Sequence, residues 1–323
     1  MRLTSAAVVL AILLSACSSP PVGSPTSSGG GSPGEGGIVA EVASFQLVAD
    51  HPGRLIVALL SADNRWLSFG TVQMRFAFLG DGKASPPPGI GVATTSAKFL
   101  PIPGTPSGGD KEPTLTEPAD GRGLYGIEPI TFPAAGFWQV TSSGRMEDGT
   151  LFSADAAFQV LAEPTLRLPG DRALASDNPV IGTPDVPPAA IDSRAATEGH
   201  IPDPELHHVS IADALRAHEP ALVVFATPVY CVSQFCGPIT DLVSALSRTY
   251  ANRAAFIHVE IYRDFQANQL NDTVRDWLQT PSGDLREPWV YLIGGDGKIL
   301  DSWDTMVTRG ELEAALKALP VRK

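Results

Sequence analysis

The pattern of hydrophobic and polar positions separates two differently built regions. In residues 38–162 the apolar runs are short, alternate in part with polar residues and are broken by glycine- and proline-rich turns. Such a pattern is typical of antiparallel strands. We therefore expect an all-β sandwich there, with a hairpin formed by residues 136–143 and 151–161.

The last region, residues 206–323, has a different pattern. Residues 221–226 and 254–261 are largely apolar runs, as in strands buried on both faces. Between them, the apolar positions of residues 239–246 recur at the spacing of one helix face. A hairpin over residues 289–303 and a final helix complete the predicted α/β domain.

Capping residues mark two of the helix starts. Thr308 and Glu311 have the spacing of a capping box, which predicts that the last helix begins there and ends before Pro320. Asn271 or Asp272 is expected to cap a short helix in the sequence NDTVRDWLQ.

Two stretches have linker composition. Residues 17–37 are rich in serine, glycine and proline, so we expect a flexible tether. Residues 163–205 have no sustained helical or strand period and are expected to form an extended connector between the two domains.

The first residues resemble an export signal. An apolar run from Ala6 to Leu14 follows Arg2 and is too short to cross a membrane as a helix. The sequence Leu-Ser-Ala-Cys that ends at Cys17 resembles the lipobox of bacterial lipoproteins. The resemblance implies that residues 1–16 are removed and that Cys17 carries a lipid, anchoring the protein on the extracytoplasmic face of the cell membrane.

The charge balance limits the partners. The net charge is −12, and basic residues do not cluster. This composition argues against nucleic acid as a partner.

The cysteine count leaves one pair that can form a disulfide. Of three cysteines, Cys17 is assigned to the lipid, which leaves Cys231 and Cys236. Outside the cytoplasm a disulfide can persist, and no histidine lies at zinc-finger spacing from the pair. We expect a disulfide here and no bound metal.

The segment VVFATPVYCVSQFCGPITD resembles the thioredoxin-like superfamily, in which a strand runs into a cysteine-containing turn that opens a helix. Pro288 stands where that family has a cis-proline facing the cysteines. The resemblance covers residues 206–323. It implies thiol–disulfide exchange on secreted or membrane protein thiols, without a cofactor. More loosely, residues 132–161 resemble the closing hairpin of immunoglobulin-like domains.

The cysteine spacing departs from the family pattern, because four residues instead of two separate Cys231 and Cys236. The nearby helix N-terminus favours a thiolate at Cys236. A position outside the helix favours exposure of Cys231. The sequence leaves both as candidate nucleophiles.

Three further residues are candidates for supporting roles. Tyr230 and Trp289 either line a substrate groove beside Pro288 or pack in the core. Glu260 either replaces the buried acid of thioredoxin or forms a hydrogen-bonded polar pair with His258, and the second interpretation is the simpler one.

Two other functions remain open. The copper-chaperone Sco family has a similar cysteine spacing on this fold, but no histidine follows His258 to act as its third ligand. Two thiolates alone can still bind Cu(I). The pair is otherwise a structural disulfide in a non-catalytic binding module, although so small a ring restrains the unfolded chain weakly.

Overall fold

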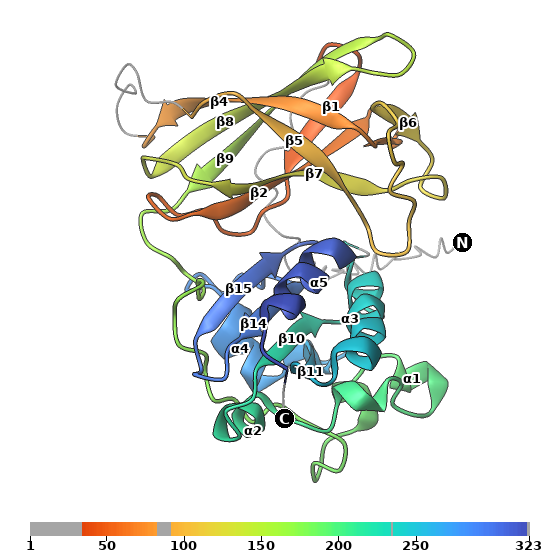
Figure 1. Ribbon diagram of the computed structural model, residues 1–323, viewed down its shortest axis with the longest axis vertical. Helices are drawn as coiled ribbons and strands as arrows, with labels where there is room; N and C mark the ends of the chain where they lie inside the picture. The colour runs from red at the N-terminus through yellow and green to blue at the C-terminus, as the bar shows by residue number, and fades with distance from the viewer. Residues whose placement is uncertain (1–33, 83–91, 234, 322–323) are drawn as a thin grey trace, which may run out of the picture.

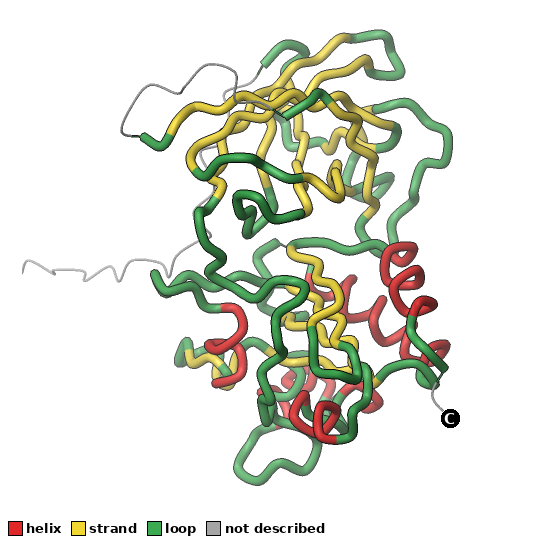
Figure 2. Tube along the Cα trace, turned by 60° about the vertical axis from the view of Figure 1, so that its left-hand side comes forward, coloured by secondary structure: helices red, strands yellow, loops and turns green. Residues whose placement is uncertain are grey.

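The computed structural model describes residues 34–82, 92–233 and 235–321. Cys17, the predicted signal segment and most of the predicted tether lie outside the described residues. Strand is twice as abundant as helix, 36% against 17%, and the protein contains the β-rich domain expected from the sequence. Figure 2 shows one half of the molecule built of strands and loops, and the other half with helices around further strands.

Nine antiparallel strands form the N-terminal region (Figure 1). They are β1 (Ile38–Val42), β2 (Gly53–Ser61), β3 (Trp66–Ser68), β4 (Thr71–Gly80), β5 (Thr95–Pro101), β6 (Thr114–Thr116), β7 (Gly123–Ile130), β8 (Gly136–Arg145) and β9 (Leu151–Val160). Their order is β6-β3-β2-β7-β5-β4-β8-β9, and β1 pairs with β2. The predicted hairpin is confirmed by the pairing of β8 with β9.

Alternation along the strands builds the core of this region. On β9, Phe152, Phe158 and Val160 point inward between exposed residues. Trp138 on β8 is fully buried, and its indole N–H donates to the carbonyl of Ala134. The alternation of buried and exposed residues therefore shows that one face of β9 lines the core.

The C-terminal region has a four-stranded mixed sheet in the order β11-β10-β14-β15. Its elements are α2 (Ile211–Arg216), β10 (Ala221–Ala226), α3 (Cys236–Tyr250), β11 (Ala255–Glu260), the small pair β12 (Tyr262–Asp264) and β13 (Gln269–Leu270), α4 (Asp272–Leu278), β14 (Trp289–Ile293), β15 (Ile299–Asp304) and α5 (Arg309–Ala318). β10 and β11 are parallel, whereas β14 runs antiparallel to β10.

Both faces of this sheet are covered. Leu222 and Val224 of β10 pack on the side of α3 and α5, whereas Val223 and Phe225 pack on the side of α2 and α4. Burial on both sides explains the continuous apolar run of β10. Thr308 and Glu311 form the predicted capping box of α5.

The segment between β9 and α2 contains three short helical turns, η1 (Pro188–Ala190), α1 (Ala195–Glu198) and η2 (Pro204–Leu206). It otherwise lacks regular structure, apart from isolated bridges. Several of its side chains are buried against the C-terminal sheet, among them Asp192, Ser193 and His207. Within the described residues, no helix is long and apolar enough to cross a membrane.

The two regions share a continuous contact surface. Ile56 and Leu124 of the β-region belong to the same hydrophobic cluster as Leu312 and Leu316 of α5. Arg54 on β2 is 6% exposed, and its guanidinium donates to Glu311 at 2.6 Å and pairs with Glu128 at 3.1 Å. In Figure 1, β2 and β7 accordingly lie next to α5.

Candidate functional site: the Cys231–Cys236 pair

Cys231 and Cys236 form a disulfide with their Cα atoms 6.0 Å apart. Cys231 lies in the loop after β10 and is partly exposed. Cys236 is the first residue of α3 and is fully buried. The sulfur of Cys231 is thus the more accessible of the two.

The strand order brings the segment before β14 to the cysteines. Trp289, the first residue of β14, pairs with Phe225 near the end of β10. Because β14 is antiparallel to β10, the start of β14 lies beside the end of β10. Glu287 and Pro288 therefore lie at the same end of the sheet as the loop that carries the cysteines. The Glu287–Pro288 bond is cis, as the thioredoxin-like resemblance implies.

Glu287 makes the closest polar contact to the disulfide. Its Oε2 lies 2.9 Å from Sγ of Cys236. Burial, and to a lesser extent the charge of Glu260, raise the pKa of the Glu287 carboxyl to about 8. At neutral pH the carboxyl is therefore largely protonated, and its O–H can donate to the sulfur, which carries no proton in the disulfide.

Sequence reasoning did not single out Glu287. The available signal was its place immediately before Pro288, in the segment expected to face the cysteines. Glu260, the acid that the sequence did single out, is buried and accepts hydrogen bonds from the backbone N–H groups of Ser193 at 2.8 Å and Ile261 at 2.9 Å. Burial raises its pKa. These contacts give Glu260 an anchoring role at the end of β11.

The two aromatic candidates occupy different environments. Tyr230 precedes Cys231 and is stacked on Phe265, with ring centroids 3.9 Å apart. Trp289 is 4% exposed, stacks on Tyr291 and lies 6.0 Å from Phe45 of the β-region. Tyr230 is placed beside the pair at the surface, whereas Trp289 packs in the core.

Two groups of described side chains have the composition of metal ligands. Cys231, Cys236 and Glu287 bring their ligand atoms within 4.8 Å of one another, and so do Asp192, His207 and His258. The disulfide leaves no thiolate for a metal in the first group.

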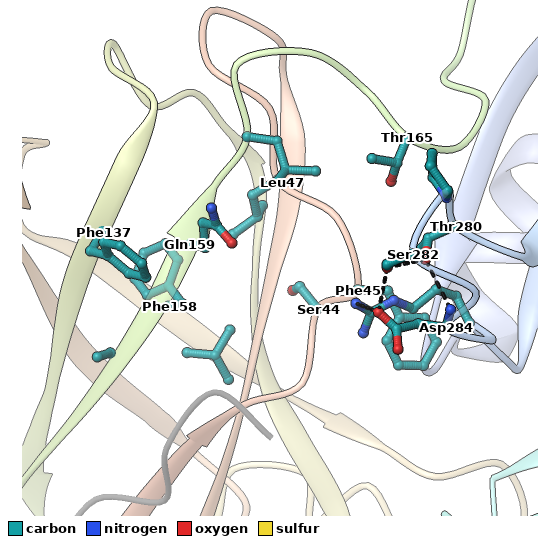
Figure 3. Close-up of a pocket in the computed structure, with 15 residues that line it drawn as sticks. Ser44, Phe45, Leu47, Phe137, Phe158, Gln159, Thr165, Thr280, Ser282 and Asp284 are labelled. Atoms are coloured by element: carbon teal, nitrogen blue, oxygen red, sulfur yellow. Dashed lines mark hydrogen bonds and ion pairs between the residues drawn. The ribbon is translucent and has the colours of Figure 1, made fainter. Parts of the chain in front are cut away.

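A sizeable cavity lies away from the cysteine pair. A pocket of about 630 Å³ is lined by the β-region, through Phe45, Leu47 and Phe158, and by the segment that carries Thr280 and Asp284 (Figure 3). Ser282 donates to Asp284 at 2.8 Å on its wall. Neither cysteine lines it.

A scan of known protein-family models found no match to this chain, and a search of curated proteins likewise found none.

Proposed function

We propose that the protein is a thioredoxin-like thiol–disulfide oxidoreductase acting on secreted or membrane protein thiols. The observation that carries the proposal is the Cys231–Cys236 disulfide at the start of α3, with the Glu287 carboxyl 2.9 Å from the buried sulfur. The order of β10, α3 and β11, followed by the β14–β15 hairpin and α5, supports the thioredoxin-like resemblance. The antiparallel strands of the N-terminal region and the hydrophobic cluster that they enclose support an immunoglobulin-like assignment.

The exposed sulfur receives the attack. A substrate thiolate forms a bond to Sγ of Cys231, and the Cys231–Cys236 bond breaks with its electron pair on Cys236. Glu287 donates its proton to the departing Cys236 thiolate and becomes a carboxylate. A second substrate thiolate then attacks the substrate sulfur of the mixed disulfide and releases Cys231. The substrate dithiol is oxidised and the protein disulfide is reduced, and the reverse sequence reduces a substrate disulfide.

A redox titration and two variants test this function. The pair should titrate against glutathione between about −120 and −270 mV, the range of known exchange proteins. Cys236→Ser should trap a mixed disulfide on Cys231, whereas Cys231→Ser should trap little on the buried Cys236. A potential below about −300 mV, without a trapped intermediate in either variant, would end the oxidoreductase proposal.

The role of Glu287 has a separate test. The rate of exchange, corrected for the thiolate fraction of the attacking thiol, should fall as the pH rises through about 8, because deprotonated Glu287 can no longer protonate Cys236. Glu287→Gln should remove this break in the pH profile. Asp284→Asn, an exposed change in the same segment, is the control and should retain it.

A second function, Cu(I) handling, is favoured by one observation. In the reduced protein Cys231, Cys236 and Glu287 would offer two soft sulfur ligands and one oxygen within a small volume. Competition with a coloured Cu(I) chelator measures this directly. Tight binding by the reduced pair together with negligible exchange with a test disulfide would favour the copper function over the oxidoreductase.

We also propose that the lipid on Cys17 anchors the protein to the extracytoplasmic face of the cell membrane. The lipobox-like sequence that ends at Cys17 supports this location, as does the Cys231–Cys236 pairing, because disulfides persist outside the cytoplasm. Cys17→Ala should move the protein from the detergent phase to the aqueous phase on phase separation. Unchanged partitioning would refute the anchor and leave the redox proposal standing.

A further inference from the structure

Three buried side chains from distant segments converge beside the C-terminal sheet. Asp192 follows η1, His207 follows η2 and His258 lies on β11. Their exposed fractions are 0%, 1% and 1%. Charged and imidazole groups are buried this deeply only when something satisfies their polar atoms.

The distances among them do not fit hydrogen bonds. Oδ2 of Asp192 lies 3.4 Å from Nε2 of His207 and 3.4 Å from Nδ1 of His258. Direct N–H···O bonds measure about 2.7–3.2 Å, and charge-assisted ones are shorter still. A tetrahedral ion with ligands at about 2.0–2.1 Å has ligand-to-ligand distances of about 3.3–3.4 Å. The two separations between the carboxylate and the rings match this second geometry, and the three ligand atoms all lie within 4.8 Å of one another.

The remaining contacts leave ring nitrogens facing the carboxylate. Nε2 of His258 lies 3.0 Å from the carbonyl oxygen of Ala226, which can only accept, so this nitrogen carries a proton. In the neutral ring the lone pair of Nδ1 then points toward Asp192. Neither ring nitrogen of His207 has a hydrogen-bond partner. A cation between these atoms would satisfy Nδ1 of His258 and Nε2 of His207. For His258, the donation of its other nitrogen to a backbone carbonyl is the usual arrangement of a metal ligand.

The surrounding charges are compatible with a cation. Arg194 holds Asp192 through both carboxylate oxygens, at 3.0 and 2.7 Å. The same guanidinium pairs with Asp203 and Asp241, each at 3.1 Å. Arg194 therefore orients the Asp192 carboxylate, while acidic groups on its other side balance its charge.

We propose that Asp192, His207 and His258 bind one divalent transition-metal ion, with Zn²⁺ the best match. Two imidazole nitrogens and one carboxylate oxygen suit zinc and its neighbours rather than Ca²⁺ or Mg²⁺, which prefer oxygen ligands.

The ion would fasten the segment that supports the cysteine loop. Ser193, next to Asp192, accepts a hydrogen bond from the backbone N–H of Val229 at 3.2 Å, two residues before Cys231. The backbone N–H of Ser193 donates to the carboxylate of Glu260 at 2.8 Å. The ion would therefore brace the chain behind the cysteine loop, with the fourth coordination position left for a ligand other than these three side chains. The site is independent of the redox function because it contains no cysteine.

The test uses the full chain in detergent, in the oxidised form so that the cysteines cannot compete. Because the ligands are buried, the protein is refolded with Zn²⁺ or with chelator and then desalted. One zinc per chain by elemental analysis, and a higher melting temperature than that of the chelator-treated protein, are expected. Asp192→Asn and His258→Gln should each weaken zinc binding at least tenfold, whereas His200→Gln, at an exposed histidine, should not.

Co²⁺ provides a readout that does not depend on variants folding. The oxidised wild-type protein should give the visible absorption of four-coordinate Co²⁺ without a sulfur charge-transfer band. Refolded wild-type protein that retains no zinc, or a cobalt spectrum that shows thiolate ligation, would overturn the proposal. The three side chains would then form a proton-sharing polar network.

Discussion

The two regions of the protein bury different kinds of side chain. In the described part of the β-region, Arg54 is the one charged side chain among the buried residues, and it lies at the contact with α5. The buried residues after position 163 include Asp192, His207, His258, Glu260 and Asp304. Burying such groups costs free energy unless partners compensate it. The difference shows that the buried ionisable groups of the described residues lie mostly in the C-terminal region, together with the Cys231–Cys236 pair.

The largest expected effect is on the β core. Trp138→Ala removes a fully buried indole and should lower the free energy of unfolding by about 3–5 kcal/mol. The reduction potential of the cysteine pair should not change, because the indole lies in the other core. Chemical denaturation and a glutathione titration measure the two quantities. Phe137→Ala, at the neighbouring residue that is 44% exposed, is the matched control and should cost far less. A changed reduction potential in Trp138→Ala would show that the core of the β-region influences the cysteine pair.

A smaller effect is expected from the buried acid at the contact between the regions. Burial raises the pKa of Asp304 to about 6, above its usual value near 4. The folded state therefore holds a proton that the unfolded state has lost between those values, so stability should fall as the pH rises from about 4 to 6. A shift of two units corresponds to about 3 kcal/mol at most. Asp304→Asn should flatten this part of the curve, and Asp155→Asn, on the exposed face of β9, should leave it intact.

The contact itself is probed by Arg54→Met. Loss of the charged hydrogen bond to Glu311 should cost about 1.5–3 kcal/mol, less whatever the methionine regains by packing. Calorimetry should then show the two regions beginning to unfold separately. The exposed Arg75→Met on β4 is the control. Retention of one cooperative transition at unchanged stability would mean that Arg54 does not couple the regions.

The smallest effect on stability is expected at the surface near the cysteines. Tyr230→Ala loses a stacked contact with Phe265 worth about 0.5–1.5 kcal/mol. If Tyr230 lines a substrate surface, exchange with a protein thiol should slow, while exchange with a small thiol should not. Equal effects on both would leave Tyr230 with a packing role only.

The sequence alone determined the elements whose signals are local. The apolar run of β10, the periodicity of α3, the β8–β9 and β14–β15 hairpins and the capping box of α5 all follow from neighbouring residues. The pairing of Cys231 with Cys236 was also accessible, because the two are close in the chain and the remaining cysteine had another assignment. Such features depend on hydrophobic periodicity, on capping residues or on turn residues, all of which can be recognised in a short stretch of sequence.

The tertiary structure decided which side chains meet. Glu287 reaches Cys236 across 51 residues because β14 lies antiparallel beside β10. His258 meets Asp192 and His207 because the connecting segment folds back over the end of β11, although its composition resembles a linker. Trp289 is buried because it packs with Tyr291 in the core of the C-terminal region, with Phe45 of the β-region 6.0 Å away between ring centroids. Periodicity records which face of an element is apolar, but strand order and register fix the distance between residues on different elements.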